Sequence, residues 1–317
     1  MQGREWTMAQ DASFHRQKFV EFAQMELDTG GPDPHMAIVG ASGYKNMPWL
    51  IGCYVARYTV ASAVALYHGR WWDPTWHMEH TSGLPIRRER RAVYPIVKTI
   101  ACLQGLDRWI QNDWPRVREA PSYEFAWKQV VSKIPFFGRY ASIKFLEGLH
   151  RYAGFPHAMP DIRPGGAWSP ILTLNLMQLE PLPEKSPYLL VNAVAEKWRL
   201  FVQSTLVGHE LDYFRYETLL CNYRQALEGK YPGRPHDTEL KYWIKAEYHW
   251  GDELEKQLPF RETRARLFNP KLLGELRGWD GPREELEDTI VKYGYFWSDL
   301  KYDYQRSKDA LVAPVPW

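Results

Sequence analysis

Apolar residues recur at helical spacing along most of the chain. Between residues 12 and 28 they alternate with charged residues at intervals of three and four, which is the period of an amphipathic helix. Ser122 is a favourable N-cap, with Glu124 in the first turn, for a helix that ends near Lys133. Further helical patterns span residues 91–112 (after Pro95), 187–207, 210–229, 237–256 and 286–308. Few windows show the two-residue alternation of a strand, so we predict an all-α, mainly helical fold.

The most apolar stretch, MPWLIGCYVARYTVASAVALYHG at residues 47–69, carries Arg57 near its middle. An arginine at the centre of a membrane span costs several kcal/mol, which argues against a transmembrane helix. We predict instead one buried helix over residues 47–68 and no membrane association. The first twenty residues are polar and lack the apolar core of a secretory signal, so no such signal is expected.

No internal repeat or low-complexity linker divides the 317 residues. The segment TGGPDPH at residues 29–35 ends the first helical pattern, and the proline-rich LEPLPEKSP at residues 179–187 is either a boundary or a loop. We predict a single mostly helical domain over residues 1–317. Its N-terminal and C-terminal helices are expected to pack on a core at about residues 80–245, and an arrangement in two lobes is the alternative.

Aromatic residues are abundant, with 15 Trp, 19 Tyr and 13 Phe. Most are expected to fill the core because large rings dominate buried area, although this surplus also suits a protein that stacks on flat ligands such as bases. The net charge of +2 gives no global basic field, but arginines concentrate in RRERR at residues 87–91, so DNA binding depends on local patches. Cys53, Cys102 and Cys221 form no CxxC motif, which is typical of reduced, buried thiols in a cytoplasmic protein.

Metal and cofactor motifs are weak. His77 and His80 lie three apart, but Pro74 and the loop-like surroundings argue against a helix that would present both to a metal. GASG at residues 40–43 lacks the lysine and the strand–helix context of a phosphate-binding loop. We therefore expect neither a metal nor a cofactor.

The segment IPFFGRYASIKFL, which begins at Ile134 and continues into a helical pattern, resembles the hairpin of the helix–hairpin–helix DNA glycosylases, whose pattern is roughly LPGVGxxTAxxIL. Matches lie at Ile134, Pro135, Gly138, Ala141, Ile143, Phe145 and Leu146. In that superfamily the hairpin turn directs backbone N–H groups at a DNA phosphate, and a catalytic aspartate follows. Asp161 lies 23 residues after Gly138, similar to the family's spacing. The resemblance implies a glycosylase-like helical bundle in which Gly138 and Arg139 bind DNA.

Two departures from the family pattern change what this resemblance implies. Phe136 replaces the first glycine of the hairpin, so the turn is expected to present fewer N–H groups or to bind phosphate less well. Tyr140 stands where some family members carry the lysine of a Schiff-base lyase, so lyase chemistry is not expected. An ordinary helix–turn–helix followed by a surface aspartate is the alternative, because short Pro-x-x-Gly turns are common.

A second stretch, RYETLLCNYRQALEGKYPGRPHDTEL at residues 215–240, resembles phage enzymes of thymine hypermodification. These are the α-glutamyl/putrescinyl-thymine pyrophosphorylases and the related amino acid:DNA transferases. PDIRPGGAWSP at residues 160–170 and GLPIRRERRAV at residues 83–93 resemble blocks of the transferase group. The resemblance implies an enzyme that works in the cytoplasm of an infected bacterial cell. Its substrates would be double-stranded DNA with 5-hydroxymethyl-uracil activated as a pyrophosphate ester, and a free amino acid such as glycine.

Displacement of pyrophosphate by an amine requires a carboxylate, cations and a pocket for an everted base. The resemblance implies that Asp161 accepts a proton from the attacking ammonium and that Arg163 binds pyrophosphate through its guanidinium. Because residues two apart project to the same side of an extended segment, both are expected to face one pocket. Glu217 is a candidate second acid or a buried partner of an arginine. The candidate walls of the base pocket are Tyr140, Trp168 and Tyr223. For each of them, core packing is the alternative.

The arginine run supplies candidate contacts to phosphate. Residues 87 and 91 would share a helical face, which could clamp the leaving group or the DNA backbone, and a solvated charge run is the alternative. The candidates are Arg87, Arg88, Arg90 and Arg91. Two other functions stay open from the sequence: a DNA glycosylase that excises a modified pyrimidine, and a non-catalytic helical DNA-binding protein.

Overall fold

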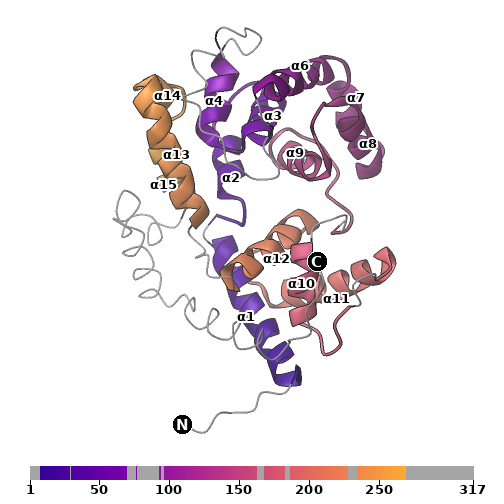
Figure 1. The fold of residues 1–317 in the computed structure, drawn as a ribbon. Helices are drawn as coiled ribbons and strands as arrows, with labels where there is room; N and C mark the ends of the chain where they lie inside the picture. The colour runs from indigo at the N-terminus through magenta and orange to yellow at the C-terminus, as the bar shows by residue number, and fades with distance from the viewer. Residues whose placement is uncertain are drawn as a thin grey trace. The chain divides into compact units, whose positions relative to one another are not determined.

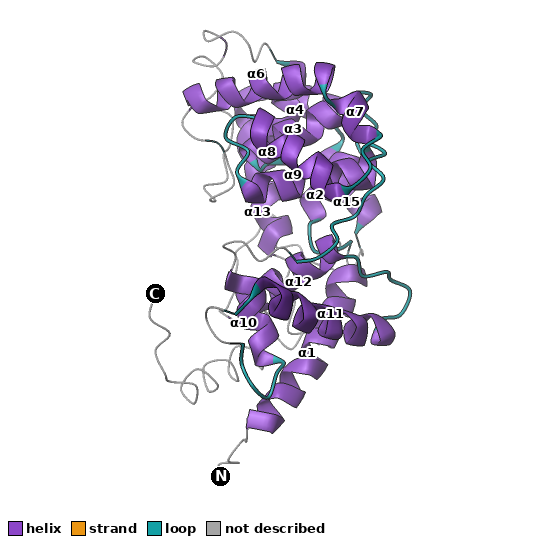
Figure 2. Ribbon diagram, turned by 90° about the vertical axis from the view of Figure 1, so that its right-hand side faces the viewer, coloured by secondary structure: helices purple, strands orange, loops and turns teal. Residues whose placement is uncertain are grey.

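The computed structural model describes residues 8–28, 30–69, 76, 93, 96–162, 168–182, 186–227 and 234–268. Within these ranges all regular secondary structure is helical, as Figure 2 shows. This confirms the prediction of an all-α fold. The predicted helix at residues 286–308 lies outside the described residues.

The chain divides into two compact units, each built from segments distant in sequence. The first unit comprises residues 1–32, 161–234 and 269–317, and the second comprises residues 33–160 and 235–268. Candidate residues Asp161, Glu217 and Tyr223 therefore belong to the first unit, whereas the hairpin around Gly138 belongs to the second. The prediction of one domain over residues 1–317 stays a prediction.

In the second unit, helix α3 (Met47–Arg57) is central: all its residues are buried, and it packs against α4, α6 and α9 (Figure 1). The other helices of this unit are α2 (Pro34–Gly40), α4 (Val60–His68), α6 (Ile96–Asn112), α7 (Trp114–Arg118), α8 (Tyr123–Lys133), α9 (Arg139–Tyr152), α13 (Arg234–Trp250), α14 (Glu253–Gln257) and α15 (Phe260–Leu267). Ser122 caps α8 by accepting a hydrogen bond from the Phe125 N–H at 3.2 Å, which confirms the predicted start and end of that helix.

The prediction of one helix over residues 47–68 is wrong, because the chain forms two helices there, α3 and α4. Tyr58 ends α3 in the left-handed region with φ of 59°, a conformation that cannot continue a right-handed helix. Thr59 then caps α4 by accepting a hydrogen bond from the Ser62 N–H at 3.3 Å. Arg57 is buried at the end of α3, as expected for a helix inside a globular fold.

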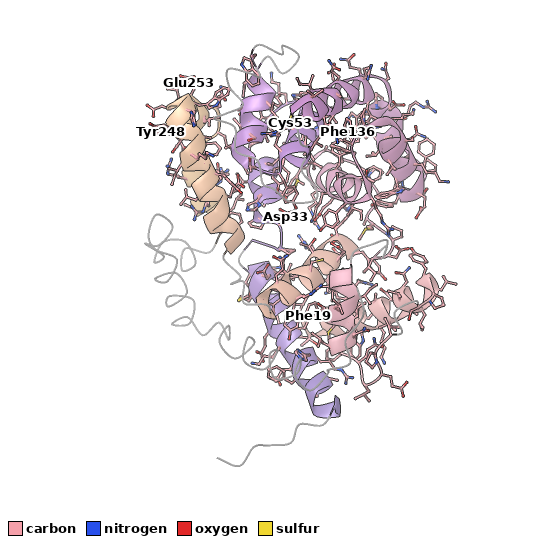
Figure 3. The ribbon with its side chains drawn as sticks, in the orientation of Figure 1. Phe19, Asp33, Cys53, Phe136, Tyr248 and Glu253 are labelled. Atoms are coloured by element: carbon pink, nitrogen blue, oxygen red, sulfur yellow. The ribbon has the colours of Figure 1, made fainter. Side chains whose placement is uncertain are left out.

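The first unit contains α1 (Met8–Asp28), α10 (Trp168–Leu176), α11 (Tyr188–Thr205) and α12 (Tyr213–Leu227). Helix α12 packs against α10 and α1, and the Thr173 hydroxyl of α10 donates a hydrogen bond to the Leu220 carbonyl of α12 at 2.7 Å. Phe19 of α1, labelled in Figure 3, is buried and meets the Tyr223 ring edge-to-face. These helices confirm the patterns at residues 12–28, 187–207 and 210–229.

No helix in the described part of the chain is long and apolar enough to cross a membrane. The three cysteines are free thiols and all are buried, as the sequence predicted. Burial raises the pKa of the Cys53 thiol well above its usual value and that of Cys102 to about 12, so neither is a nucleophile at neutral pH.

Candidate functional site

The turn between α8 and α9 has the geometry of a tight hairpin. The Phe137 N–H donates to the Ile134 carbonyl at 3.2 Å, and Pro135 occupies the second position of this four-residue turn. Phe136, in the third position, has φ of 65°. Proline followed by a residue with positive φ is the signature of a type II turn, in which the third residue is usually glycine.

Phe136 thus has the backbone conformation that glycine adopts most easily, at the position where the glycosylase hairpin carries its first glycine. A phenylalanine here therefore does not prevent the turn from adopting a conformation with positive φ. The Phe136 side chain (labelled in Figure 3) is 49% exposed, and Lys98 Nζ of α6 lies 5.7 Å from the centre of its ring. The turn therefore presents an aromatic ring and a cation to solvent.

Gly138 is the N-cap of α9, with φ of −63° and ψ of 175°. Its carbonyl accepts the hydrogen bond of the Ser142 N–H at 3.0 Å, and no side chain caps the helix. A Cβ built at Gly138 meets no atom within 4 Å, so the glycine faces open space. The Gly138 N–H itself donates to the Phe136 carbonyl at 2.9 Å, so the turn uses two of its own N–H groups internally, as expected from the replacement of the first glycine. The start of α9, with Arg139 and Tyr140 as its first two residues, still provides the positive end of a helix dipole.

A close contact with α6 fixes the position of the turn. A Cβ at Gly105 of α6 would lie 2.1 Å from Cδ of Pro135, so only glycine lets the turn approach this helix. Sequence reasoning missed this residue. An isolated glycine inside a helical pattern is the signal that could have identified it.

Buried charges anchor α9 to α2. Lys144, only 1% exposed, forms ion pairs with Asp33 at 3.2 Å and with Glu147 at 2.8 Å. Burial opposes ionisation of Asp33, but the charges of Lys144 and His35 outweigh it and hold the pKa of this carboxyl below its usual value. Asp33 also caps α2, accepting from the Met36 N–H at 3.3 Å. The hairpin's second helix is therefore held rigidly by a buried network.

Asp161 lies in the first unit, between Pro160 and the buried Ile162. Asp161 is half-buried, and it is not the N-cap of any described helix. Its Oδ2 accepts a hydrogen bond from the hydroxyl of Tyr188, the first residue of α11. Its carboxylate is therefore reachable from solvent and is held by a side chain from another segment. Arg163, its expected partner toward pyrophosphate, lies outside the described residues.

Glu217 and Tyr223 are buried in α12 of the first unit. The Cys221 thiol donates to Glu217 Oε1 at 3.6 Å, and the Tyr223 hydroxyl lies 2.9 Å from Nδ1 of His15. Tyr223 is 0% exposed among Phe19 and other rings, so a base does not reach it in this conformation. The burial of Tyr223 favours core packing, whereas the roles of Glu217 as a second acid or as the partner of an arginine both stay predictions.

The remaining candidates divide between described and undescribed positions. Arg139 and Tyr140 are half-buried at the first turn of α9. Trp168 begins α10, but its side chain is outside the described part of the structure. The arginines at residues 87–91 and the pair His77 and His80 lie outside it too, and within the described ranges no three His, Cys, Asp or Glu side chains form a group that could hold a metal ion.

No protein-family model matches this chain, no curated protein is significantly similar to it in sequence, and no solved structure is significantly similar to it in fold. The likeness to glycosylases and transferases therefore rests on the segments quoted above and on the geometry of the α8–α9 turn.

Proposed function

We propose that this protein is an amino acid:DNA transferase, which joins a small amino acid such as glycine to pyrophosphorylated 5-hydroxymethyl-uracil in phage DNA. The observation that carries the proposal is the α8–α9 turn, where Phe136 has a glycine-type backbone and Gly138 starts a helix with open space around it. This geometry suits a DNA phosphate bound at the positive end of the α9 dipole, at the first turn of the helix. As part of the same proposal, the helices of this protein are arranged as in the helix–hairpin–helix DNA glycosylases.

The proposed reaction also requires a carboxylate that the substrate can reach, and Asp161 supplies it. In the proposed reaction it takes one proton from the ammonium of the amino acid, because only the neutral amine is nucleophilic. The amine lone pair forms a bond to the exocyclic methylene carbon of the base. The carbon–oxygen bond to pyrophosphate breaks, and its electron pair leaves with the pyrophosphate. Arg163 is expected to bind the leaving group.

The same turn and acid also suit a DNA glycosylase, in which the carboxylate would stabilise charge that develops at the sugar carbon. The two functions differ in their products. A glycosylase releases free base and leaves abasic sites without an amino acid, whereas the transferase leaves the base attached and releases pyrophosphate. Incubation with pyrophosphorylated DNA and labelled amino acids therefore tests the proposal, and the expected result is label in DNA with one pyrophosphate released per amino acid.

Substitution of Gly138 by aspartate is expected to stabilise the fold slightly while weakening DNA binding. Aspartate is a better N-cap than glycine, and the extended backbone at Gly138 and the space around it accommodate the side chain. The new charge would, however, stand where the phosphate is proposed to bind. We expect a weaker DNA affinity and a salt slope reduced by about one, measured by fluorescence anisotropy at several salt concentrations.

Gly138→Asn is the matched control, because asparagine caps a helix as well as aspartate does but carries no charge. It is expected to bind DNA more tightly than Gly138→Asp at equal thermal stability. Equal DNA affinity of the two variants and the unsubstituted protein would show that no phosphate approaches this turn.

A further inference from the structure

Tyr188 and Asp161 pair across 27 residues of sequence. The Tyr188 hydroxyl donates its hydrogen bond to Asp161 Oδ2, and the Tyr188 side chain is 44% exposed. Because an exposed tyrosine does not need a protein partner for its hydroxyl, burial alone does not account for this pairing. The two residues thus form an accessible tyrosine–carboxylate pair in the first unit.

A proline precedes each member of this pair. Pro160 precedes Asp161, and the following Ile162 is buried and anchors the segment. Pro187 precedes Tyr188 as the N-cap of α11. Proline restricts its own backbone angle, so each of the two residues follows a position with a fixed φ. A hydrogen bond to a carboxylate is also stronger than one between neutral groups, and it restrains rotation of the acceptor.

We propose that Tyr188 is a positioning residue that orients the Asp161 carboxylate toward the incoming amine. This inference rests on the proposed function, since it assigns Tyr188 a role in the step where Asp161 takes the ammonium proton. A carboxylate held in one orientation meets the amine without first losing rotational freedom, which increases the rate of the chemical step rather than the affinity for substrate. Tyr188 itself exchanges no proton with the substrate.

The test compares Tyr188→Phe with Tyr248→Phe in the transfer assay. Tyr188→Phe keeps the ring and removes only the hydroxyl, and Tyr248 is a control that is 88% exposed on α13 of the second unit. We expect Tyr188→Phe to lower kcat roughly ten- to a hundredfold, with unchanged KM for DNA and unchanged melting temperature. Tyr248→Phe is expected to match the unsubstituted enzyme.

The second arm introduces Tyr188→Phe into the Asp161→Asn variant. If the tyrosine acts through Asp161, the double variant loses less than about twofold in kcat beyond Asp161→Asn alone. A further tenfold loss there, or full activity of Tyr188→Phe, overturns the positioning role while the proposed function stands. An unsubstituted protein that transfers no amino acid instead refutes the proposed function, and the positioning role falls with it.

Discussion

Asp161→Asn is expected to lower amino acid transfer by about 10²- to 10⁴-fold while DNA binding stays unchanged. The substitution removes the group that takes the ammonium proton, and general-base assistance is typically of this size. The amide keeps the shape of the side chain and can still accept the hydrogen bond of the Tyr188 hydroxyl. Steady-state kinetics with pyrophosphorylated DNA, alongside anisotropy measurements of DNA affinity, separate the chemical step from binding.

Asp252→Asn provides the matched control. Asp252 is exposed in the second unit and its side chain makes no capping hydrogen bond to α14, so the same loss of charge occurs in the unit that does not contain Asp161. Transfer by this variant is expected to equal that of the unsubstituted protein. If Asp161→Asn retains full transfer activity, or if it loses activity and DNA binding together, Asp161 is not the base of the reaction.

Glu26→Gln is expected to stabilise the protein at pH 8.5 and to leave its stability unchanged near pH 4.5. Burial raises the pKa of Glu26 to about 8, and the hydrogen bond from Asn222 Nδ2 at 3.1 Å offsets only part of this effect. A group with a raised pKa in the folded state contributes stability that is present below its unfolded pKa and is lost as pH rises through the folded pKa. The contribution of Glu26 therefore disappears between about pH 4.5 and pH 8.

Glutamine resembles protonated glutamate and does not titrate, so the difference between the variant and the unsubstituted protein isolates Glu26. At pH 8.5 we expect glutamine to raise the free energy of unfolding by roughly 3–5 kcal/mol, from denaturant titrations followed by tryptophan fluorescence. His15 on the same helix has the opposite dependence, because burial lowers its pKa to about 4, so its contribution is lost as pH falls from about 6.5. The contribution of His15 is the same in the variant and in the unsubstituted protein, so it cancels when the two are compared. A pH-independent effect of Glu26→Gln would contradict this account.

Helical periodicity predicted the longer helices α1, α6, α8, α9, α11, α12 and α13 but missed the short helices α2, α7, α10 and α15. The predicted helix at residues 237–256 is wrong in its middle, because Gly251, with φ of 59°, separates α13 from α14. The break at Tyr58 was missed, since tyrosine rarely adopts a left-handed conformation and only tertiary packing fixes it there. Thr59 was the available signal, as a favourable N-cap ahead of an apolar run. Three of the four crossings between units lie next to Pro32, Pro160 and Pro235, and prolines are too common in loops to mark such boundaries alone.

The candidate site was predictable only in its local parts. The turn at Gly138 follows from neighbouring residues, and so does the start of α9. Lys144 was not predictable as a buried residue, because lysine is rarely buried without partners and those partners come partly from another helix. Tyr188 was missed for the same reason, because its pairing with Asp161 is a tertiary contact. From the sequence, Tyr223 was compatible both with stacking on a base and with core packing. In the structure it is buried against Phe19 of α1, a contact that the local sequence does not predict.

The most direct test of the proposed function is the mass of the nucleosides from DNA treated with this protein. Double-stranded DNA carrying pyrophosphorylated 5-hydroxymethyl-uracil is incubated with the unsubstituted protein and glycine, and in parallel with each other amino acid. It is then digested to nucleosides and analysed by mass spectrometry, with Asp161→Asn as the inactive control. The proposal predicts a nucleoside in which the glycine nitrogen is joined to the exocyclic methylene, together with an equal amount of pyrophosphate. Free modified base with abasic sites, or DNA that is unchanged in the presence of every amino acid, would contradict it.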